Sequence, residues 1–262
     1  MPRRIITLTT DFGLSDHFVG TMKGIMLGIH PAAELVDISH QVNPFEIAEA
    51  GFLLWQAYRY FPKKTVHLVV VDPGVGTSRR PILAEAAGQY FVTPDNGVLS
   101  MIYSREKHKV RHVTAEKFFL KPVSETFHGR DIFAPAAAHL AAGTPPAHFG
   151  RLITDYLRLE FDKPTRTGKR IWTGAILKID HFGNLITNFH VGEFPTVQTQ
   201  PFVMAVGAER LTRVVRTFAD CPIGEVCVMV GSSGYLEVIS NRASAAKMLG
   251  CAVGAPAELT LY

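Results

Sequence analysis

One short loop carries a carboxylate and a guanidinium. It runs Asp-Pro-Gly-Val-Gly over residues 72–76, and Arg79 follows it closely. The loop comes directly after Leu68–Val71, an apolar run typical of a strand buried on both faces. In open α/β sheets, ligands bind at the carboxyl ends of such strands. Asp72 and Arg79 are therefore candidates for chemistry on a ligand, and the alternative is a turn-closing Asp with a surface arginine as its partner.

The glycines of this loop do not complete a nucleotide-binding motif. Gly74-x-Gly76 lacks the third glycine of a dinucleotide fingerprint because position 79 is arginine, and no Lys-Ser/Thr pair follows to make a phosphate loop. The chain has 11 histidines, but no His-Glu-x-x-His pattern and no Cys/His cluster. We therefore expect neither a metal site nor a separate cofactor.

Two further polar clusters in the first half stand where an apolar run ends in turn-forming residues. Asp11 follows the run Ile5–Leu8, where it could accept both hydroxyls of a ribose or simply cap the next helix. His128 precedes a glycine and a helix start, so it could act as a base or an orienting group, or be an ordinary surface histidine. Asp131 nearby is a candidate helix cap.

The second half contains two more clusters. Asp180 and Asn184 interrupt two apolar runs, where Asp180 could accept a ligand ammonium and Asn184 could pair with a base edge. The alternative is a hairpin turn, because Phe-Gly-Asn is also good turn chemistry. The segment 231–237 offers backbone amides in a Gly/Ser loop, a weak signal that suits a turn or a purine.

The elements that position the first clusters alternate between strand and helix. Short β-branched or apolar runs predict strands over 4–9, 35–38, 66–71 and 90–93, and helical spacing from Phe18 to Ile29 predicts a helix between the first two. Asn43, Pro44 and Glu46 look like an N-cap, a first-turn proline and a capping box for a second helix. A further helix is expected over 133–141. This alternation indicates an α/β fold with a mainly parallel sheet flanked by helices.

The pattern changes after the Pro-Pro break at 145–146. Strand candidates then follow at close spacing, which is typical of a small antiparallel barrel or sandwich, with one helix near 243–249; the candidates are 171–179, 184–189, 202–206, 212–216, 225–230, 235–239 and 257–261. We therefore expect an α/β N-terminal domain over residues 1–160 and a smaller antiparallel, β-barrel-like C-terminal domain over 168–262. The linker falls within 144–168.

Composition limits the possible partners. Of the 262 residues, 47% are hydrophobic and 19% charged, and the net charge is only +4. The densest basic run, 105–112, has no interleaved aromatic residues and indicates a solvated face, so we expect no nucleic-acid partner. No apolar stretch approaches the length of a membrane span. Three cysteines make no disulfide framework, and we expect a reducing, cytoplasmic location.

Taken together, the motifs resemble those of the S-adenosyl-L-methionine (SAM) hydroxide adenosyltransferases, relatives of the fluorinating and chlorinating enzymes that act on the same substrate. The match covers nearly the whole chain, and the joint order and spacing of its motifs are highly specific: Thr-Asp-Phe-Gly at 10–13, Asp-Pro-Gly-Val-Gly-Thr at 72–77, Arg79, Phe-His-Gly-Arg-Asp at 127–131, Ile-Asp-His-Phe-Gly-Asn at 179–184 and Ser-Ser-Gly-Tyr-Leu-Glu at 232–237. The resemblance implies a two-domain subunit, a homotrimer with active sites at subunit interfaces, and hydrolysis of SAM to adenosine and L-methionine.

The resemblance also implies a role for each matching residue. Asp72, Arg79 and His128 correspond to the catalytic polar triad of the hydroxide-using branch. The substrate-binding residues fall into three groups: Asp11 on the ribose hydroxyls, Asp180 on the amino group of the methionine part, and Phe45, Asn184, Ser232 and Ser233 around the adenosine. Gly231 stands where many relatives have asparagine, and Ser233 where the fluorinating enzyme has arginine, so adenine contacts are expected to differ.

Two positions indicate which branch of this family the chain resembles, the hydroxide-using or the halide-using one. The halide enzymes have a tyrosine where this chain has Asp72, and a carboxylate beside the reacting carbon repels a halide while it can accept a hydrogen bond from water. The fluorinating enzyme has a serine at the position of Gly129. We therefore expect water or hydroxide as the nucleophile. The alternatives are a halide-dependent adenosyltransferase, a non-catalytic SAM or adenosine binder, and a generic nucleotide hydrolase, for which the chain has neither phosphate loop nor metal carboxylates.

Overall fold

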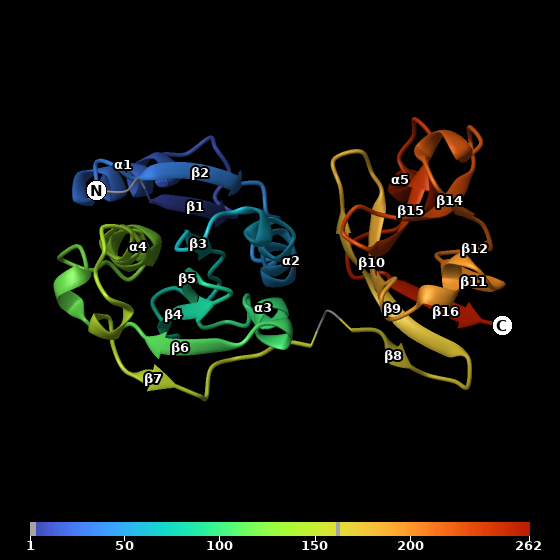
Figure 1. Ribbon diagram of the computed structural model, residues 1–262. Helices are drawn as coiled ribbons and strands as arrows, with labels where there is room; N and C mark the ends of the chain where they lie inside the picture. Colours follow the sequence, from blue (N-terminus) through green and yellow to red (C-terminus); the bar gives the residue numbers. More distant parts are fainter. Residues whose placement is uncertain (1–3, 161–162) are drawn as a thin grey trace. The chain divides into compact units, whose positions relative to one another are not determined.

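A computed structural model describes residues 4–160 and 163–262 of the chain (Figure 1). The chain forms two compact units, Met1–Leu159 and Glu160–Tyr262, and each has its own sheet and hydrophobic core. The first unit is mixed α/β and the second is mainly β, as the sequence predicts. None of the helices within the described ranges is long and apolar enough to cross a membrane.

The first unit is built on a seven-stranded sheet in the order β2-β1-β3-β5-β4-β6-β7. Its strands are β1 (Ile5–Thr10), β2 (Glu34–Ser39), β3 (Val66–Val70), β4 (Pro81–Ala86), β5 (Gln89–Pro94), β6 (His108–His112) and β7 (Leu152–Ile153). The pairs from β2 to β5 are parallel, and those from β5 to β7 are antiparallel. The prediction of a mainly parallel sheet is therefore correct for one half of the sheet only.

A tight hairpin explains the difference. Strands β4 and β5 are joined by Ala87 and Gly88, whose φ values of +52° and +75° have the signs of a two-residue hairpin turn. Alanine is unusual at such a turn, so the sequence gives little warning of it. The basic run at 105–112 forms the end of helix α3 (Ser100–Arg105) and all of β6, where Val110 is buried in the sheet.

Helices cover both faces of this sheet. Figure 1 shows α1 (Phe18–Ile29) and α4 (Ala134–Ala141) on one face, and α2 (Ile47–Ala57) and α3 on the other. The predicted α1 is confirmed, and its apolar side buries Met22 and Met26 against β1 and β3. A five-residue π-helical turn, Gly129–Phe133, leads directly into α4.

The predicted start of α2 is wrong. The helix begins at Ile47, and its N-cap residue Glu46 makes no side-chain capping bond. Asn43 does not cap the helix: its backbone N–H and its side-chain amide both donate to the Glu49 carboxylate, at 3.0 and 2.9 Å. The segment before α2 is therefore a separate turn rather than the first turn of the helix.

The parallel register sets where the polar loops emerge. Thr10, the last residue of β1, is paired with Val70, the last residue of β3. Asp11 and Asp72 therefore follow neighbouring parallel strands and leave the sheet at the same edge, at the carboxyl ends of both strands. This is the edge at which open α/β sheets bind ligands.

The second unit is a curled nine-stranded sheet in which β8 pairs with β9, and the other strands follow the order β12-β11-β16-β9-β10-β15-β14-β13. The strands are β8 (Thr165–Arg166), β9 (Ile171–Ile179), β10 (Leu185–His190), β11 (Phe202–Val206), β12 (Glu209–Leu211), β13 (Val214–Val215), β14 (Val226–Val230), β15 (Tyr235–Ser240) and β16 (Pro256–Leu261). All pairs are antiparallel except β13 with β14. Helix α5 (Ala245–Leu249) packs its buried alanines on this core.

Candidate active site

Asp72 and Arg79 form a buried, two-point ion pair. Arg79 Nε donates to Asp72 Oδ1 at 3.0 Å, and Arg79 Nη2 donates to Asp72 Oδ2. The two side chains are only 5% and 7% exposed, so the surface-pair alternative from the sequence does not describe them. The guanidinium also lies over the ring of Phe133, with Cζ 5.1 Å from the ring centroid. A fixed, bidentate geometry with little water around it makes this pair a rigid polar group.

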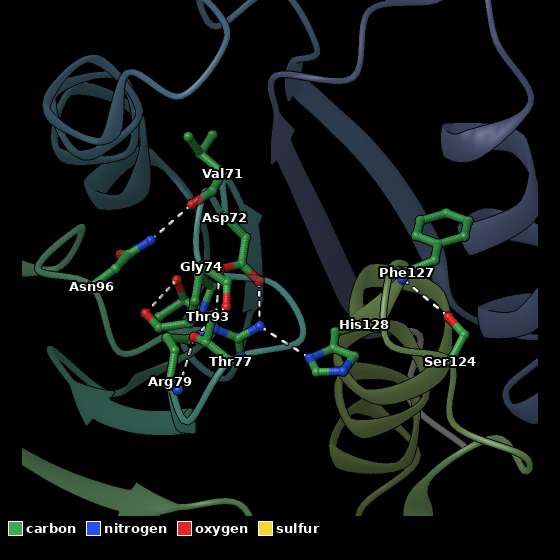
Figure 2. Close-up of polar contacts among 11 residues, drawn as sticks. Val71, Asp72, Gly74, Thr77, Arg79, Thr93, Asn96, Ser124, Phe127 and His128 are labelled. Atoms are coloured by element: carbon green, nitrogen blue, oxygen red, sulfur yellow. Dashed lines mark hydrogen bonds and ion pairs between the residues drawn. The ribbon is translucent and has the colours of Figure 1, made fainter.

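His128 joins this pair through the same guanidinium nitrogen. Figure 2 shows Arg79 between Asp72 and His128, with Nη2 3.1 Å from His128 Nδ1. Arginine has no acceptor atom, so Nδ1 must supply the lone pair. A neutral His128 therefore carries its proton on Nε2. The structure thus brings together all three residues that the sequence assigns to the triad.

The protonation of the triad follows from burial and from its mutual charges. Burial raises the pKa of the Asp72 carboxyl, and the Arg79 charge and its hydrogen bonds oppose that rise. Burial and then the Arg79 charge lower the pKa of His128, against weaker opposing effects from Asp72 and Asp131. His128 is therefore held neutral near pH 7, in the state that can accept from Arg79. Arg79 keeps one further donor: Nη1 is buried with no hydrogen-bond partner in the described part of the chain.

The loop that carries Asp72 and Arg79 is shaped by its glycines and threonine. Thr77 Oγ1 donates to the Gly74 carbonyl at 2.7 Å and accepts the N–H of Arg79 at 3.3 Å. Gly76 has φ +77°, and a Cβ added there would lie 2.4 Å from the backbone oxygen of Glu125. The loop therefore presses directly against the segment that leads to His128, which only glycine allows.

The segment that carries His128 is anchored by a buried carboxylate. Asp131, whose side chain is fully buried, accepts two hydrogen bonds from Arg130 at 2.6 and 2.9 Å and one from the Ser124 N–H at 2.8 Å. The predicted helix-capping role of Asp131 is wrong, because its oxygens are turned back toward the preceding loop. Ser124 Oγ accepts the N–H of Phe127 at 3.0 Å, as Figure 2 shows.

Aromatic rings tie this segment to the loop that carries Asp11. The ring of Phe127, next to His128, packs edge-on against Phe12, next to Asp11, at a centroid distance of 6.0 Å. Phe18 of α1 contacts both rings, at 5.1 and 5.7 Å. The Asp11 loop and the His128 segment are therefore held in a fixed relation by residues adjacent to the candidate groups.

Asp11 and Phe45 are joined by a hydrogen bond. Asp11 Oδ2 accepts the backbone N–H of Phe45 at 2.9 Å, across 34 residues of sequence. Phe45 has φ +71°, which costs a non-glycine residue on the order of 1 kcal/mol, and it is 69% exposed. An exposed aromatic residue held in a strained backbone conformation is an expected feature of a ligand-binding surface. The structure thus connects two residues that the sequence links only by family resemblance.

In the second unit, Asp180 and Asn184 form one closed loop between β9 and β10. Asp180 Oδ1 accepts the N–H groups of Phe182 and Asn184 at 2.9 and 2.8 Å, and its Oδ2 accepts the Asn184 side-chain amide at 2.8 Å. Asn184 is only 2% exposed. Gly183 closes the loop with φ +87°, where an added Cβ would lie 2.1 Å from Ser244 Oγ. The segment is a hairpin turn, and the Asp180 carboxylate is fixed within it.

The Ser232–Ser233 turn lies at the other end of strand β10. This turn joins β14 to β15 and is closed by hydrogen bonds across Gly231, and β15 pairs with β10 so that Tyr235 stands opposite His190. The Asp180 loop leads into Leu185, at the opposite end of β10. The structure does not bring the serines into contact with Asp180.

Glu237 lies on β15 between these two segments, and no role was predicted for it from the sequence. It stands opposite Ile186 on β10, and an added Cβ on Gly231 would lie 1.8 Å from its Oε1. Burial, together with the Asp180 charge, raises the pKa of Glu237 to about 7. Glycine at position 231 therefore leaves room for the Glu237 carboxyl group. The sequence signal that could have pointed to Glu237 is this glycine, at a position where many relatives have asparagine.

Asn96 is a second residue that the sequence reasoning missed. It follows β5 and donates from its side chain to the carbonyl of Val71 at 2.8 Å, which fixes the backbone immediately before Asp72 (Figure 2). The Asn-Gly pair at 96–97, a strong turn signal after a strand, could have found it. Elsewhere, no three His, Cys, Asp or Glu side chains within residues 4–160 and 163–262 are grouped so as to hold a metal ion.

Models of one protein family match both units of the chain. The model of the SAM hydroxide adenosyltransferase N-terminal domain matches residues 6–150, and that of the corresponding C-terminal domain matches residues 174–258. The chain belongs to the SAM hydroxide adenosyltransferase family. All the candidate residues on the first unit lie within the first match, and all those on the second unit lie within the second. The resemblance of the motifs is thereby confirmed.

Relatives place the chain within this family. It is 35% identical to an (R)-S-adenosyl-L-methionine hydrolase of Thermus thermophilus, with 98% of this chain and 99% of the relative covered. It is 30% identical to a fluorinase of an Actinoplanes species, with 91% of each covered. The crystal structure of an uncharacterized conserved protein from Thermotoga maritima superposes with a TM-score of 0.90 at 38% identity, covering 98% of this chain and 99% of the other.

Proposed function

We propose that this family member is a SAM hydrolase that forms adenosine and L-methionine. The observation that carries the proposal is the hydrogen-bonded group of Asp72, Arg79 and His128, with its buried Asp72–Arg79 ion pair, at the edge of the sheet where the strand that precedes Asp11 also ends. A protein that only binds its ligand has no need of such a group. The names of the hydrolase relatives support the same conclusion.

The reaction is an in-line displacement at C5′ of the ribose. The oxygen of water or hydroxide forms a bond to C5′ while the C5′–S bond breaks, and the electron pair of that bond stays on sulfur. The sulfonium thereby becomes the neutral thioether of methionine, so the leaving group needs no further activation. Holding nucleophile, carbon and sulfur in line supplies up to roughly 7–11 kcal/mol in ideal cases.

The triad acts on the nucleophile. Asp72, as a carboxylate, orients the water and receives its proton, either before the attack on C5′ or during it. Arg79 favours negative charge on the attacking oxygen, and its buried Nη1 is a donor left over for that purpose. His128 uses Nδ1 to accept from Arg79, so its Nε2–H is a donor, and we assign it to orienting the water rather than to removing its proton.

The remaining predicted residues hold the substrate. Asp11 binds the ribose hydroxyls, Phe45 lines the adenosine pocket, and Asp180 binds the ammonium of the methionine part. Ser232 and Ser233 offer backbone amides to adenine. We propose that Asn184 holds adenine, and its side-chain amide also donates to Asp180 Oδ2 at 2.8 Å, which supports a further role in fixing that carboxylate.

The family of the chain also bears on its assembly and location. We infer that the subunit has two domains, 1–160 and 168–262, and that three subunits form a homotrimer with active sites at subunit interfaces. We also infer that the protein acts in the cytoplasm and that SAM is its substrate, with no cofactor. Each unit exposes a large apolar side chain at its predicted site residues, Phe45 in the first unit and Phe182 in the second. Such exposed apolar side chains support the inference that a partner subunit covers these surfaces.

The halide alternative is disfavoured by packing as well as by charge. A Cβ on Gly129 would already lie 3.2 Å from both Met22 Sδ and the Phe127 ring, so the hydroxyl of a serine has little room there. The Asp72 carboxylate adds repulsion toward any anion that approaches the carbon.

Product analysis tests the proposal. Purified protein is incubated with SAM alone and with added chloride or fluoride, and the products are separated by liquid chromatography. Adenosine and methionine in equal amounts, with no 5′-halo-nucleoside, are expected under all three conditions. A 5′-halo-nucleoside would assign the protein to the halide-using branch, and SAM bound but unchanged after long incubation would make it a binding protein.

A further inference from the structure

The turn that carries Phe45 has an aromatic residue where the backbone calls for glycine. Glu46 N–H donates to the carbonyl of Asn43 at 3.0 Å and closes a four-residue turn, with Pro44 second and Phe45 third. Proline fixes a negative φ at the second position, and φ is +71° at the third. This combination is a type II turn, whose third position is normally glycine or asparagine. Intrinsic preference therefore does not explain why Phe45 adopts this conformation.

The Asp11 carboxylate supplies the missing stabilisation. Its Oδ2 accepts the N–H of Phe45 at 2.9 Å, so a charge-assisted hydrogen bond holds the amide that the turn points away from its own interior. Asp11 is itself fixed, because it follows the buried end of β1 and precedes Phe12, whose ring packs on Phe127. The loop after β1 is thus a rigid base from which one carboxylate oxygen reaches the turn.

The other oxygen of Asp11 remains for a ligand. Among the hydrogen bonds of residues 4–160 and 163–262, the one to Asp11 ends on Oδ2. The Phe45 ring, 69% exposed, belongs to the same hydrogen-bonded unit. A carboxylate that takes a cis-diol and an aromatic ring that covers the apolar part of a nucleoside are therefore coupled through a single backbone amide.

We propose that Asp11 is a positioning residue for Phe45 as well as a ligand for the ribose, so that the two act as one recognition element for a nucleoside with an intact cis-diol. This deepens the proposed function and rests on it for the identity of the ligand. Its consequence is that loss of the Asp11 carboxylate removes two contributions to affinity, only one of which involves the sugar hydroxyls.

A ligand without the hydroxyls separates the two roles. Adenosine and 2′,3′-dideoxyadenosine are titrated by calorimetry into the full-length protein and its Asp11→Ala, Phe45→Leu and doubly substituted variants, with Asp16→Ala, an exposed acid of the same loop, as a matched control. Phe45→Leu is expected to weaken both ligands about tenfold, which corresponds to roughly 1.4 kcal/mol. Asp11→Ala is expected to weaken dideoxyadenosine by a similar factor and adenosine by more, and adding Phe45→Leu to Asp11→Ala should cost less than twofold further.

Wild-type affinity of the Asp11→Ala variant for dideoxyadenosine would overturn the proposal, and so would independent, multiplying effects of the two substitutions. Asp11→Asn, which keeps an acceptor oxygen, should rescue dideoxyadenosine binding in part.

A measurement without ligand keeps the test independent of the proposed function. Hydrogen exchange of the segment 41–47 is followed by mass spectrometry in the wild type, Asp11→Asn and Asp11→Ala. We expect faster exchange of the Phe45 amide in Asp11→Ala only, with other segments unchanged. Equal exchange in all three proteins would refute the positioning role. Failure of the wild type to bind adenosine would instead count against the proposed function and leave this readout intact.

Discussion

Nη2 of Arg79 is shared between the Asp72 carboxylate and Nδ1 of His128, the latter at 3.1 Å. One guanidinium nitrogen thus sets the protonation state of both of its neighbours: it requires an ionised Asp72 and a neutral His128. All three residues are hydrogen-bonded only when Asp72 is ionised and His128 is neutral. Protonation of Asp72 or His128 therefore disrupts these hydrogen bonds.

The pH dependence of the reaction should reflect this pattern. Burial raises the pKa of Asp72 above its ordinary value of 3.8, and burial and the Arg79 charge lower the pKa of His128 below its ordinary value of 6.5. Turnover should therefore fall on the acid side, because Asp72 protonates above pH 3.8 and His128 only below pH 6.5. In Arg79→Gln, the His128 pKa loses one of its two depressing influences, so the acid limb should move to higher pH in addition to a large loss of rate. Rate–pH profiles of the two proteins at saturating SAM measure this, and an unshifted limb would separate His128 from the triad.

Asp72→Asn keeps the shape of the side chain and removes the charge. We expect kcat to fall by about 10²- to 10⁴-fold, the range typical of a lost proton-accepting group, while KM for SAM changes little. Asp155→Asn is the matched control, because Asp155 is an exposed acid paired with the neighbouring Arg80. Steady-state kinetics with wild-type turnover in Asp72→Asn would remove this carboxylate from the mechanism.

Two glycines of one loop should respond differently to alanine. A Cβ on Gly76 meets the Glu125 carbonyl at 2.4 Å in a left-handed conformation, whereas a Cβ on Gly74 meets its neighbours at 3.5 Å or more. Gly76→Ala should therefore separate the Arg79 loop from the His128 segment, lower kcat strongly and destabilise the fold by about 1–3 kcal/mol. Gly74→Ala should remain near the wild type in both. Equal behaviour of the two variants in kinetics and chemical denaturation would contradict the contact between the loops.

Asp131 should contribute stability that depends on pH. Burial alone would raise the pKa of Asp131, but the hydrogen bonds from Arg130 and Ser124 outweigh burial and lower this pKa below its ordinary value of 3.8. The stabilisation is therefore present above pH 3.8 and is lost as pH falls through the lower folded-state pKa. Asp131→Asn should cost about 1–3 kcal/mol at pH 7, because it leaves a buried donor without a carboxylate oxygen. The difference from the wild type should shrink below pH 3.8, as measured by urea unfolding, with the exposed Glu116→Gln as control.

The contribution of Glu237 to stability should depend on pH in the opposite direction to that of Asp131. Its pKa is raised from 4.5 to about 7, mainly by burial and secondarily by Asp180, so the folded state holds a proton that the unfolded state has lost between these values. Wild-type stability should therefore decline between pH 4.5 and 7 relative to Glu237→Gln, which does not titrate. Parallel stability curves for the two proteins would show that Glu237 ionises normally.

Much of this site could be predicted from sequence, because the chemistry stands at the ends of strands. Apolar runs locate β1 and β3, and their parallel pairing places Asp11 and Asp72 on one edge. The joint order of the motifs then identifies the family. The contacts that unite the triad and anchor Phe45 span 49 and 34 residues, and no local pattern encodes such pairings.

The failures have local causes. The start of α2 is wrong because Asn-Pro followed by Glu also suits a separate turn, and only the strained Phe45 shows which of the two is formed. Strand β4 escapes prediction because Ala87 occupies a hairpin turn that normally selects asparagine or glycine. Glu237 was overlooked because its raised pKa depends on burial and on the charge of Asp180, and its carboxyl group lies against Gly231. Both residues lie outside the strand that carries Glu237, so the local sequence does not show these contacts.

The central claim is that a solvent oxygen attacks C5′ of the substrate ribose. It is tested most directly by incubating the protein with SAM in oxygen-18 water and locating the label by mass spectrometry of the products. We expect label on the 5′-oxygen of adenosine and none in methionine. Unlabelled adenosine, or label in an amino-acid product formed together with a thioether nucleoside, would contradict it.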